Sequence, residues 1–93
     1  MSQFLFQLFV AGDTPRSQQA IENLRLLCEE MGDDSPECVV IDVLDKPELA
    51  EAERILTTPT LIKVTPPPAR RVTGDLSDRE GVLRGLTLQI NRP

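Results

Sequence analysis

Two short apolar runs on either side of one amphipathic stretch constrain the fold of the first half of the chain. Residues 4–10 are almost continuously apolar, and residues 38–43 are rich in β-branched side chains. Between them, Asp13-Thr14-Pro15 is typical of a capped helix start, and Gly32 is typical of a helix end. A strand, a helix and a strand within about 40 residues predict a βαβ unit, whose strands are parallel in nearly every case.

The predicted helix carries an apolar stripe that should face the core, made of Ala20, Ile21, Leu24, Leu27, Cys28 and Met31. Cys28 lies on this stripe, and Cys38 begins the second strand. Two cysteines are too few for a disulfide scaffold, and they do not form a C-x-x-C pair. We therefore interpret both as buried thiols that behave as small apolar side chains.

The second half of the chain contains shorter elements. Residues 48–56 follow Pro47 and fit a short helix, whose core side chains would be Leu49, Ala52, Ile55 and Leu56. Residues 60–64 and 71–73 fit two strands, and Gly74-Asp75 marks a turn after them. Between the strands, Pro66, Pro67 and Pro68 favour a stiff, extended connector.

The end of the chain fits two conformations. Ser77 and Glu80 have the spacing of a capping box, so a helix should begin there. The residues that follow match a helical stripe at Val82, Leu83, Leu86 and Ile90. Leu86–Ile90 also alternates with period two, as a half-buried strand does, and Gly81 and Gly85 each weaken a helix interior by about 1 kcal/mol. The pattern alone leaves an ordinary terminal helix and a strand as alternatives.

Length and composition limit the class of protein. Ninety-three residues fit one domain, residues 1–93, and so short a chain buries only about 60–65% of its unfolded surface, which predicts marginal stability. The sequence has no run of 18 apolar residues and no basic segment before an apolar one. We therefore expect no membrane span, no secretory signal and a cytoplasmic location.

Charge and residue types argue against nucleic-acid binding and catalysis. The net charge is −5, with seven acidic and two basic residues in positions 1–41, and there is no Tyr or Trp on which bases could stack. Without histidine, the usual general base and the imidazole metal ligand are missing. The turn at residues 11–15 lacks the glycines and lysine of a phosphate-binding loop. We predict a protein that is not an enzyme and has no catalytic residue, metal or cofactor.

The βαβ opening followed by Thr58-Pro59-Thr60-Leu61 resembles a thioredoxin-like domain. In that fold a Pro-Thr-Leu segment holds a cis proline beside the redox loop. Thioredoxins carry C-x-x-C in the redox loop, where this chain has Gly12-Asp13-Thr14-Pro15. The resemblance therefore implies the fold without thiol–disulfide exchange, and a thioredoxin-like oxidoreductase that uses Cys28 or Cys38 is kept as an alternative function.

A more extensive resemblance, to the KaiB family, spans nearly the whole chain. Its segments are weak singly but specific in their order and spacing: Phe9-Val10-Ala11-Gly12-Asp13-Thr14-Pro15-Arg16-Ser17, Val40-Ile41-Asp42-Val43, residues 46–51, residues 55–61, residues 66–71 and residues 74–80. The resemblance implies an α/β fold in which the βαβ half is constant. The second half is βααβ in a tetrameric ground state, or αββα in a thioredoxin-like monomer.

KaiB resemblance also implies function and partners. It implies a non-enzymatic, fold-switching regulator that binds the hexameric ATPase KaiC; in cyanobacteria such a protein also displaces a sensor histidine kinase and captures KaiA. A tetramer or dimer is implied for the ground state. The alternative function is that of a KaiB-like sensor domain of a histidine kinase.

Site residues follow from the same resemblance. Pro59 corresponds to the cis proline, Pro66, Pro67 and Pro68 to the prolines of the switch region, and Gly85 to the glycine near the rearranging end. The KaiC-binding surface is expected on residues 46–54, with these side chains exposed: Lys46, Glu48, Glu51 and Arg54. Thr87 stands where many clock KaiBs have Asp, and a long acidic tail is missing after Pro93. These departures point to a KaiB outside the main clock, in a host without KaiA.

Overall fold

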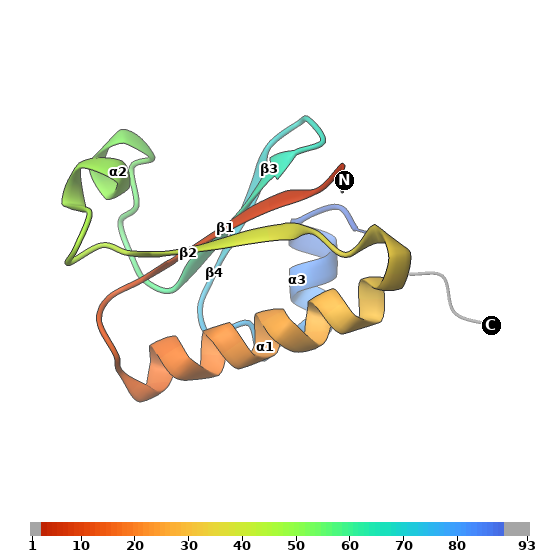
Figure 1. Cartoon of the computed structure of the whole chain (residues 1–93), viewed down its shortest axis with the longest axis horizontal. Coiled ribbons are helices and arrows are strands. Elements are labelled where there is room, and N and C mark those ends of the chain that lie inside the picture. The colour runs from red at the N-terminus through yellow and green to blue at the C-terminus, as the bar shows by residue number, and fades with distance from the viewer. Residues whose placement is uncertain (1–2, 89–93) are drawn as a thin grey trace.

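The computed structural model describes residues 3–88 and contains one mixed sheet with three α-helices (Figure 1). In chain order the elements are β1 (Leu5–Val10), α1 (Pro15–Met31), the 3₁₀ turn η1 (Gly32–Asp34), β2 (Glu37–Asp42), α2 (Pro47–Ala52), β3 (Thr60–Thr65), β4 (Arg70–Thr73) and α3 (Arg79–Gly85). The strands lie in the order β2-β1-β3-β4, so β2 and β4 are the edges.

The first half is the predicted βαβ unit. Strands β1 and β2 are parallel, with Leu5 opposite Glu37 and Val10 opposite Asp42. Thr14 caps α1 by accepting a hydrogen bond from the Ser17 amide at 3.1 Å, and a proline follows at the first helical position. Gly32 ends the helix at a φ of 56°, which glycine adopts without steric cost.

The second half has the αββα order. Strand β3 is antiparallel to β1, and β4 is antiparallel to β3. The chain thus has the thioredoxin-like arrangement, the second of the two expected for its fold class.

The core lies mainly on one face of the sheet, between the strands and the helices α1 and α3. This cluster joins buried side chains of β1, β3, α1 and α3 and the loop before α3: Phe6, Leu8, Val10, Ala20, Leu24, Leu27, Leu61, Leu76, Val82 and Leu86. On the other face a smaller cluster contains Phe9, Ile41 and Ile62, with half-buried Ile55 packed against it. Strand β1 supplies buried residues to both faces, which explains its continuous apolar run.

The predicted apolar stripe of α1 is correct in its centre and wrong at one residue. Ala20, Leu24 and Leu27 are buried, and Cys28 and Met31 pack partly against the core, but Ile21 is 41% exposed. Ser17 is buried instead, one turn before Ala20, because its hydroxyl is paired with that of Thr14 at 3.0 Å. A paired hydroxyl can be buried at little cost.

Helix α2 is shorter than predicted. It ends at Ala52, where the amides of Arg54 and Ile55 bond to the carbonyls of Glu51 and Ala50. This is a Schellman motif, and it places Arg54 in the left-handed region at a φ of 54°. The predicted inward stripe is therefore wrong at three positions. Ala52 is exposed, Leu49 is 40% exposed and Leu56 is 95% exposed.

The predicted capping box is also wrong. Helix α3 begins at Arg79, and its cap is Asp78, whose carboxylate accepts from the Gly81 amide at 3.1 Å. The Ser77 amide instead donates to the Asp75 carboxylate at 3.0 Å. An aspartate caps a helix as well as a serine does. Because Asp78 is the cap here, the helix starts one residue later than predicted.

The prolines form the tip of the β3–β4 hairpin and not an extended connector. Lys63 is buried, and its ammonium group donates to the carbonyls of Pro66 at 2.6 Å and Pro68 at 3.1 Å. These bonds fold the loop back onto β3. The Thr58–Pro59, Thr65–Pro66 and Pro67–Pro68 peptide bonds are cis.

Of the two conformations left open for the end of the chain, residues 79–85 adopt the helix. Beyond it, Thr87 has a φ of 56°, and the Leu88 amide bonds to the Leu83 carbonyl at 2.8 Å. Val82 and Leu86, from the helical stripe, are buried. Gln89 and Ile90, which complete the period-two pattern, lie outside the described residues.

Candidate interaction surface around the second helix

The segment from Leu44 to Leu56 lies at one end of the molecule, with α2 standing clear of the sheet (Figure 1). We define the α2 surface by seven of its exposed side chains: Leu44, Lys46, Glu48, Leu49, Glu51, Arg54 and Leu56. The four charged residues proposed from the sequence are among them. Lys46 is the N-cap residue, Glu48 and Glu51 lie on the helix, and Arg54 follows its end. Among residues 3–88, no ion pair within 4 Å involves these four side chains.

Apolar residues of the α2 surface were missed by sequence reasoning. Leu44 is 72% exposed and Leu56 is 95% exposed. Two valines of the neighbouring edge strand β2, Val39 and Val40, are also nearly half exposed. A group of exposed apolar side chains on one surface indicates a site that binds another protein. A sequence signal for Leu44 is its place between a strand and the Asp45-Lys46-Pro47 turn, where no core position is available.

Asp42 fixes the start of the α2 surface. Its Oδ1 atom accepts the Gly12 amide at 3.0 Å and the Leu44 amide at 2.9 Å, so one carboxylate joins the β1–α1 loop to the segment leading into α2. Gly12 has a φ of 70°, and a Cβ atom there would lie 3.3 Å from Leu44. The loop and Leu44 are therefore in close contact.

Replacing Asp42 with alanine should lower the free energy of unfolding by about 1–2 kcal/mol, because the Gly12 amide loses its acceptor in a partly buried bond and the Leu44 amide loses its acceptor in an exposed one. Asp42→Asn keeps an oxygen in place and should lose less than about 1 kcal/mol. Urea unfolding of the two variants checks this. Equal losses would show that the two hydrogen bonds do not carry the effect.

The proposed switch residues lie at three separate places. Pro59 is buried before β3, and its carbonyl accepts the Gly74 amide at 2.9 Å. Pro66, Pro67 and Pro68 occupy the hairpin tip. Gly85 ends α3 against β4, where an added Cβ atom would overlap Val72 Cγ1. The structure does not bring these residues together, and their part in a rearrangement stays a prediction.

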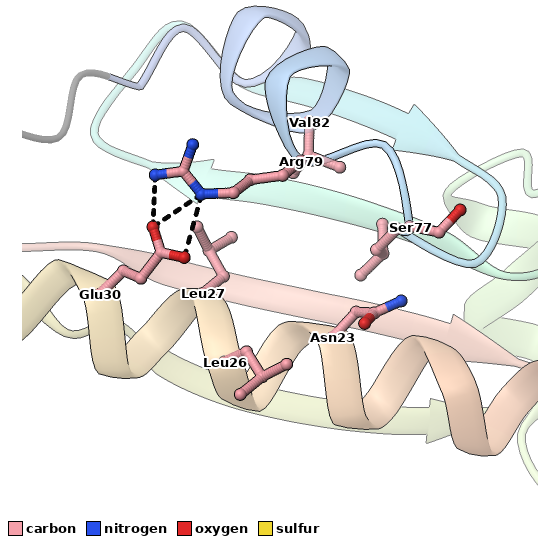
Figure 2. A pocket seen from close by; sticks show the side chains of 8 residues that line it. Asn23, Leu26, Leu27, Glu30, Ser77, Arg79 and Val82 are labelled. Atoms are coloured by element: carbon pink, nitrogen blue, oxygen red, sulfur yellow. Dashed lines mark hydrogen bonds and ion pairs between the residues drawn. The ribbon is translucent and has the colours of Figure 1, made fainter.

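A seam joins α3 and the loop before it to α1. The Arg79 guanidinium bonds to the Glu30 carboxylate, and the Asn23 side chain donates to the Asp75 carbonyl at 2.8 Å. Figure 2 shows Arg79 reaching from α3 toward Glu30 on α1, above Leu27. A pocket of about 110 Å³ lies along this seam. The ion pair is partly exposed, so it stabilises the seam only modestly.

The structure corrects the interpretation of the cysteines. Cys28 is half-buried, but Cys38 is exposed, and their Sγ atoms are 3.3 Å apart. The hydrogen bond from Cys38 lowers the pKa of the Cys28 thiol, and the same bond raises the pKa of Cys38. The pairing was missed because the two residues belong to different elements.

Two further observations limit the chemistry of the described part of the chain. Residues 3–88 contain no group of three or more Cys, Asp or Glu side chains placed to hold a metal ion. None of the helices within that range is long and apolar enough to cross a membrane.

Sequence comparison relates this chain to one protein family. The family model described as the KaiB domain matches residues 7–88. The chain is 53% identical over 85 residues to the circadian clock oscillator protein KaiB of Prochlorococcus marinus strain MIT 9313, covering 91% of this chain and 71% of that protein. It is 52% identical to the protein of the same name from Microcystis aeruginosa, covering 91% of this chain and 82% of the relative.

Solved structures of similar fold include a SasA domain and thioredoxins. The N-terminal domain of SasA from Synechococcus elongatus matches with a TM-score of 0.76 and 28% identity, covering 100% of this chain and 91% of that one. Mitochondrial thioredoxin 3 from Saccharomyces cerevisiae matches with a TM-score of 0.73 and 16% identity, covering 94% and 79%. The second likeness concerns the fold alone.

Proposed function

Because the chain belongs to the KaiB family, we propose that it is a non-enzymatic regulator that binds the KaiC ATPase ring through the α2 surface in its thioredoxin-like arrangement. The observation that carries the proposal is the exposure of Leu44 and Leu56 beside charges that have no partner among the described residues. Covering such side chains is favourable, since burying one leucine contributes about 1.5–3 kcal/mol.

The regulation that we propose is a change of fold in the second half. A partner that binds one arrangement draws the population toward it, by as much as its affinity differs between the two. The seam supports this idea, because the side-chain bonds described there, Arg79–Glu30 and Asn23–Asp75, are partly exposed and cost little to break. The pairing of β1 with β2 lies wholly in the other half and can persist through the change.

The alternative arrangement that we propose is the βααβ form, assembled as a tetramer or dimer. The protein acts in the cytoplasm in this proposal. Competition with a sensor histidine kinase for the ring is supported by the likeness to the SasA domain, since two domains of one fold can occupy one site. A partnership with KaiA is the least supported part, because Thr87 departs from the pattern of many clock KaiBs.

A sensor domain of a histidine kinase is the second candidate function. It is favoured by the match of the SasA domain to the whole chain, at 28% identity. The identity of 53% to a KaiB protein favours the first candidate.

The test is co-elution with a KaiC hexamer from the same organism in the presence of ATP. We expect the complex to appear slowly, over minutes or longer, because the binding arrangement must first be populated. Rapid saturation would contradict the switch while leaving ring binding intact. Failure to associate over many hours would contradict the function itself.

A further inference from the structure

Two thiols meet where the last turn of α1 lies beside the start of β2. Cys28 comes from the helix and Cys38 from the strand, and their Sγ atoms are 3.3 Å apart. In Figure 1 these two segments lie at the same end of the molecule, joined by a short turn. A disulfide bond holds its sulfur atoms about 2.05 Å apart, so an approach of about 1.3 Å would bring the two within bonding distance.

We propose that Cys28 and Cys38 form a reversible dithiol–disulfide site, oxidised by small-molecule disulfides of the glutathione type. The site does not coincide with the redox loop of thioredoxins, which corresponds to residues 12–15 between β1 and α1. It is also independent of the proposed ring binding, because both cysteines belong to the βαβ half and lie outside the α2 surface.

The surroundings of the two thiols differ. Cys38 is exposed on the edge strand β2, while Cys28 is half-buried against the core. The hydrogen bond between the two sulfur atoms lowers the pKa of the Cys28 thiol. The thiolate is the attacking species in thiol–disulfide exchange. Either thiol can attack first, because the lower pKa favours Cys28 and the greater exposure favours Cys38, and the other thiol then completes the reaction.

The exchange balances in two steps. The thiolate of the first cysteine attacks one sulfur of oxidised glutathione, so that a mixed disulfide with glutathione forms and one glutathione thiolate leaves. The second cysteine then loses its proton and attacks the sulfur of the first, which breaks the mixed disulfide and releases the second glutathione thiolate. Two protein thiols are oxidised, one glutathione disulfide is reduced to two thiols, and the two protons from the protein end on glutathione.

The physical consequence is a cross-link between α1 and β2. It closes the short loop that contains η1 and fixes the end of the helix against an edge of the sheet. Such a bond restricts the unfolded chain, and so stabilises the half of the fold that does not rearrange in the proposed function. The α2 surface stays free.

The test is oxidation of the folded protein by excess oxidised glutathione. We expect the intact mass to fall by two hydrogen atoms and the unfolding midpoint to rise by roughly 10 °C, with both changes reversed by dithiothreitol. Cleavage after Glu29, Glu30 or Glu37 puts the cysteines on separate peptides, which should stay joined until reduction. The bond should form at least about tenfold faster in the folded chain than in urea, because the fold holds the thiols together.

Single-cysteine variants are the controls. Cys38→Ser should stop at a glutathione adduct on Cys28, and neither it nor Cys28→Ser should gain the higher midpoint. The proposal is overturned if the native chain stays reduced, stops at the adduct, or links two chains. It is also overturned if the bond forms equally fast in urea.

Discussion

Replacement of Leu56 by serine should weaken binding to a KaiC hexamer about tenfold or more. The side chain is 95% exposed in the free protein. Its replacement should therefore not destabilise the fold as replacement of a buried leucine would. If a partner covers it, the lost burial amounts to about 1.5–3 kcal/mol, and each 1.4 kcal/mol is a factor of ten in affinity. Titration of labelled protein with the hexamer gives the dissociation constant.

The matched control is Ile21→Ser on the outer side of α1. Ile21 is also an exposed aliphatic residue, at 41%, but it lies outside the α2 surface. We expect its affinity to match that of the unchanged protein. Equal weakening by both variants would show a general effect of apolar exposure, and no weakening by Leu56→Ser would move the interface away from the α2 surface.

The second large effect is expected at Thr87, just after α3. Its φ of 56° lies in the left-handed region, where a β-branched side chain is strained by roughly 1–2 kcal/mol. Glycine removes this strain, and Thr87 is exposed, so little contact is lost. Thr87→Gly should therefore favour the thioredoxin-like arrangement by about 1–2 kcal/mol, or roughly five- to thirtyfold in population.

The measurement is the ratio of two slowly exchanging sets of backbone resonances. If only one set is present, the same gain should appear as a higher free energy of unfolding. Thr87→Val is the control, because it keeps the branched shape and the strain. A gain with valine as large as with glycine would refute the backbone explanation, and a loss with glycine would refute the left-handed conformation.

Thr87 connects this prediction to the departure noted in the sequence. The family resemblance implies Asp at this place, and Asp tolerates the left-handed region better than a β-branched residue does. The threonine therefore weakens the end of α3 in the arrangement seen here. We expect it to shift the balance between the two folds toward the ground state.

Sequence reasoning worked well where local signals and burial agree. The βαβ half was predicted because Thr14-Pro15 and Gly32 mark the helix ends and two apolar runs lie at strand length on either side. The strands β3 and β4 and the exposure of the four charged α2 residues were also predicted. These features depend on residues close together in the chain.

The sequence failed where two local signals compete. The apolar period across residues 48–56 continues past the observed helix end at Ala52. Nothing in that period predicts that Arg54 adopts the left-handed backbone conformation that ends the helix. Ser77 and Asp78 are both good caps, and short-range spacing does not distinguish them; in the structure Asp78 caps α3. A shift of one residue in the end of α2 changes which leucines are buried, and the same shift in the start of α3 changes which amides are capped.

The amino-acid order was sufficient to establish the βαβ half, the absence of histidine chemistry and the family resemblance, since each rests on residue type and short-range spacing. It left open which form the second half takes. In the structure Val82 and Leu86 pack in the core with side chains of α1 and the sheet, and this packing requires the helix. The apolar pattern alone fits a helix and a strand equally well, so only the tertiary contacts distinguish them. The meeting of Cys28 with Cys38 and the exposure of Leu56 arise in the same way, from how separate elements are placed in three dimensions.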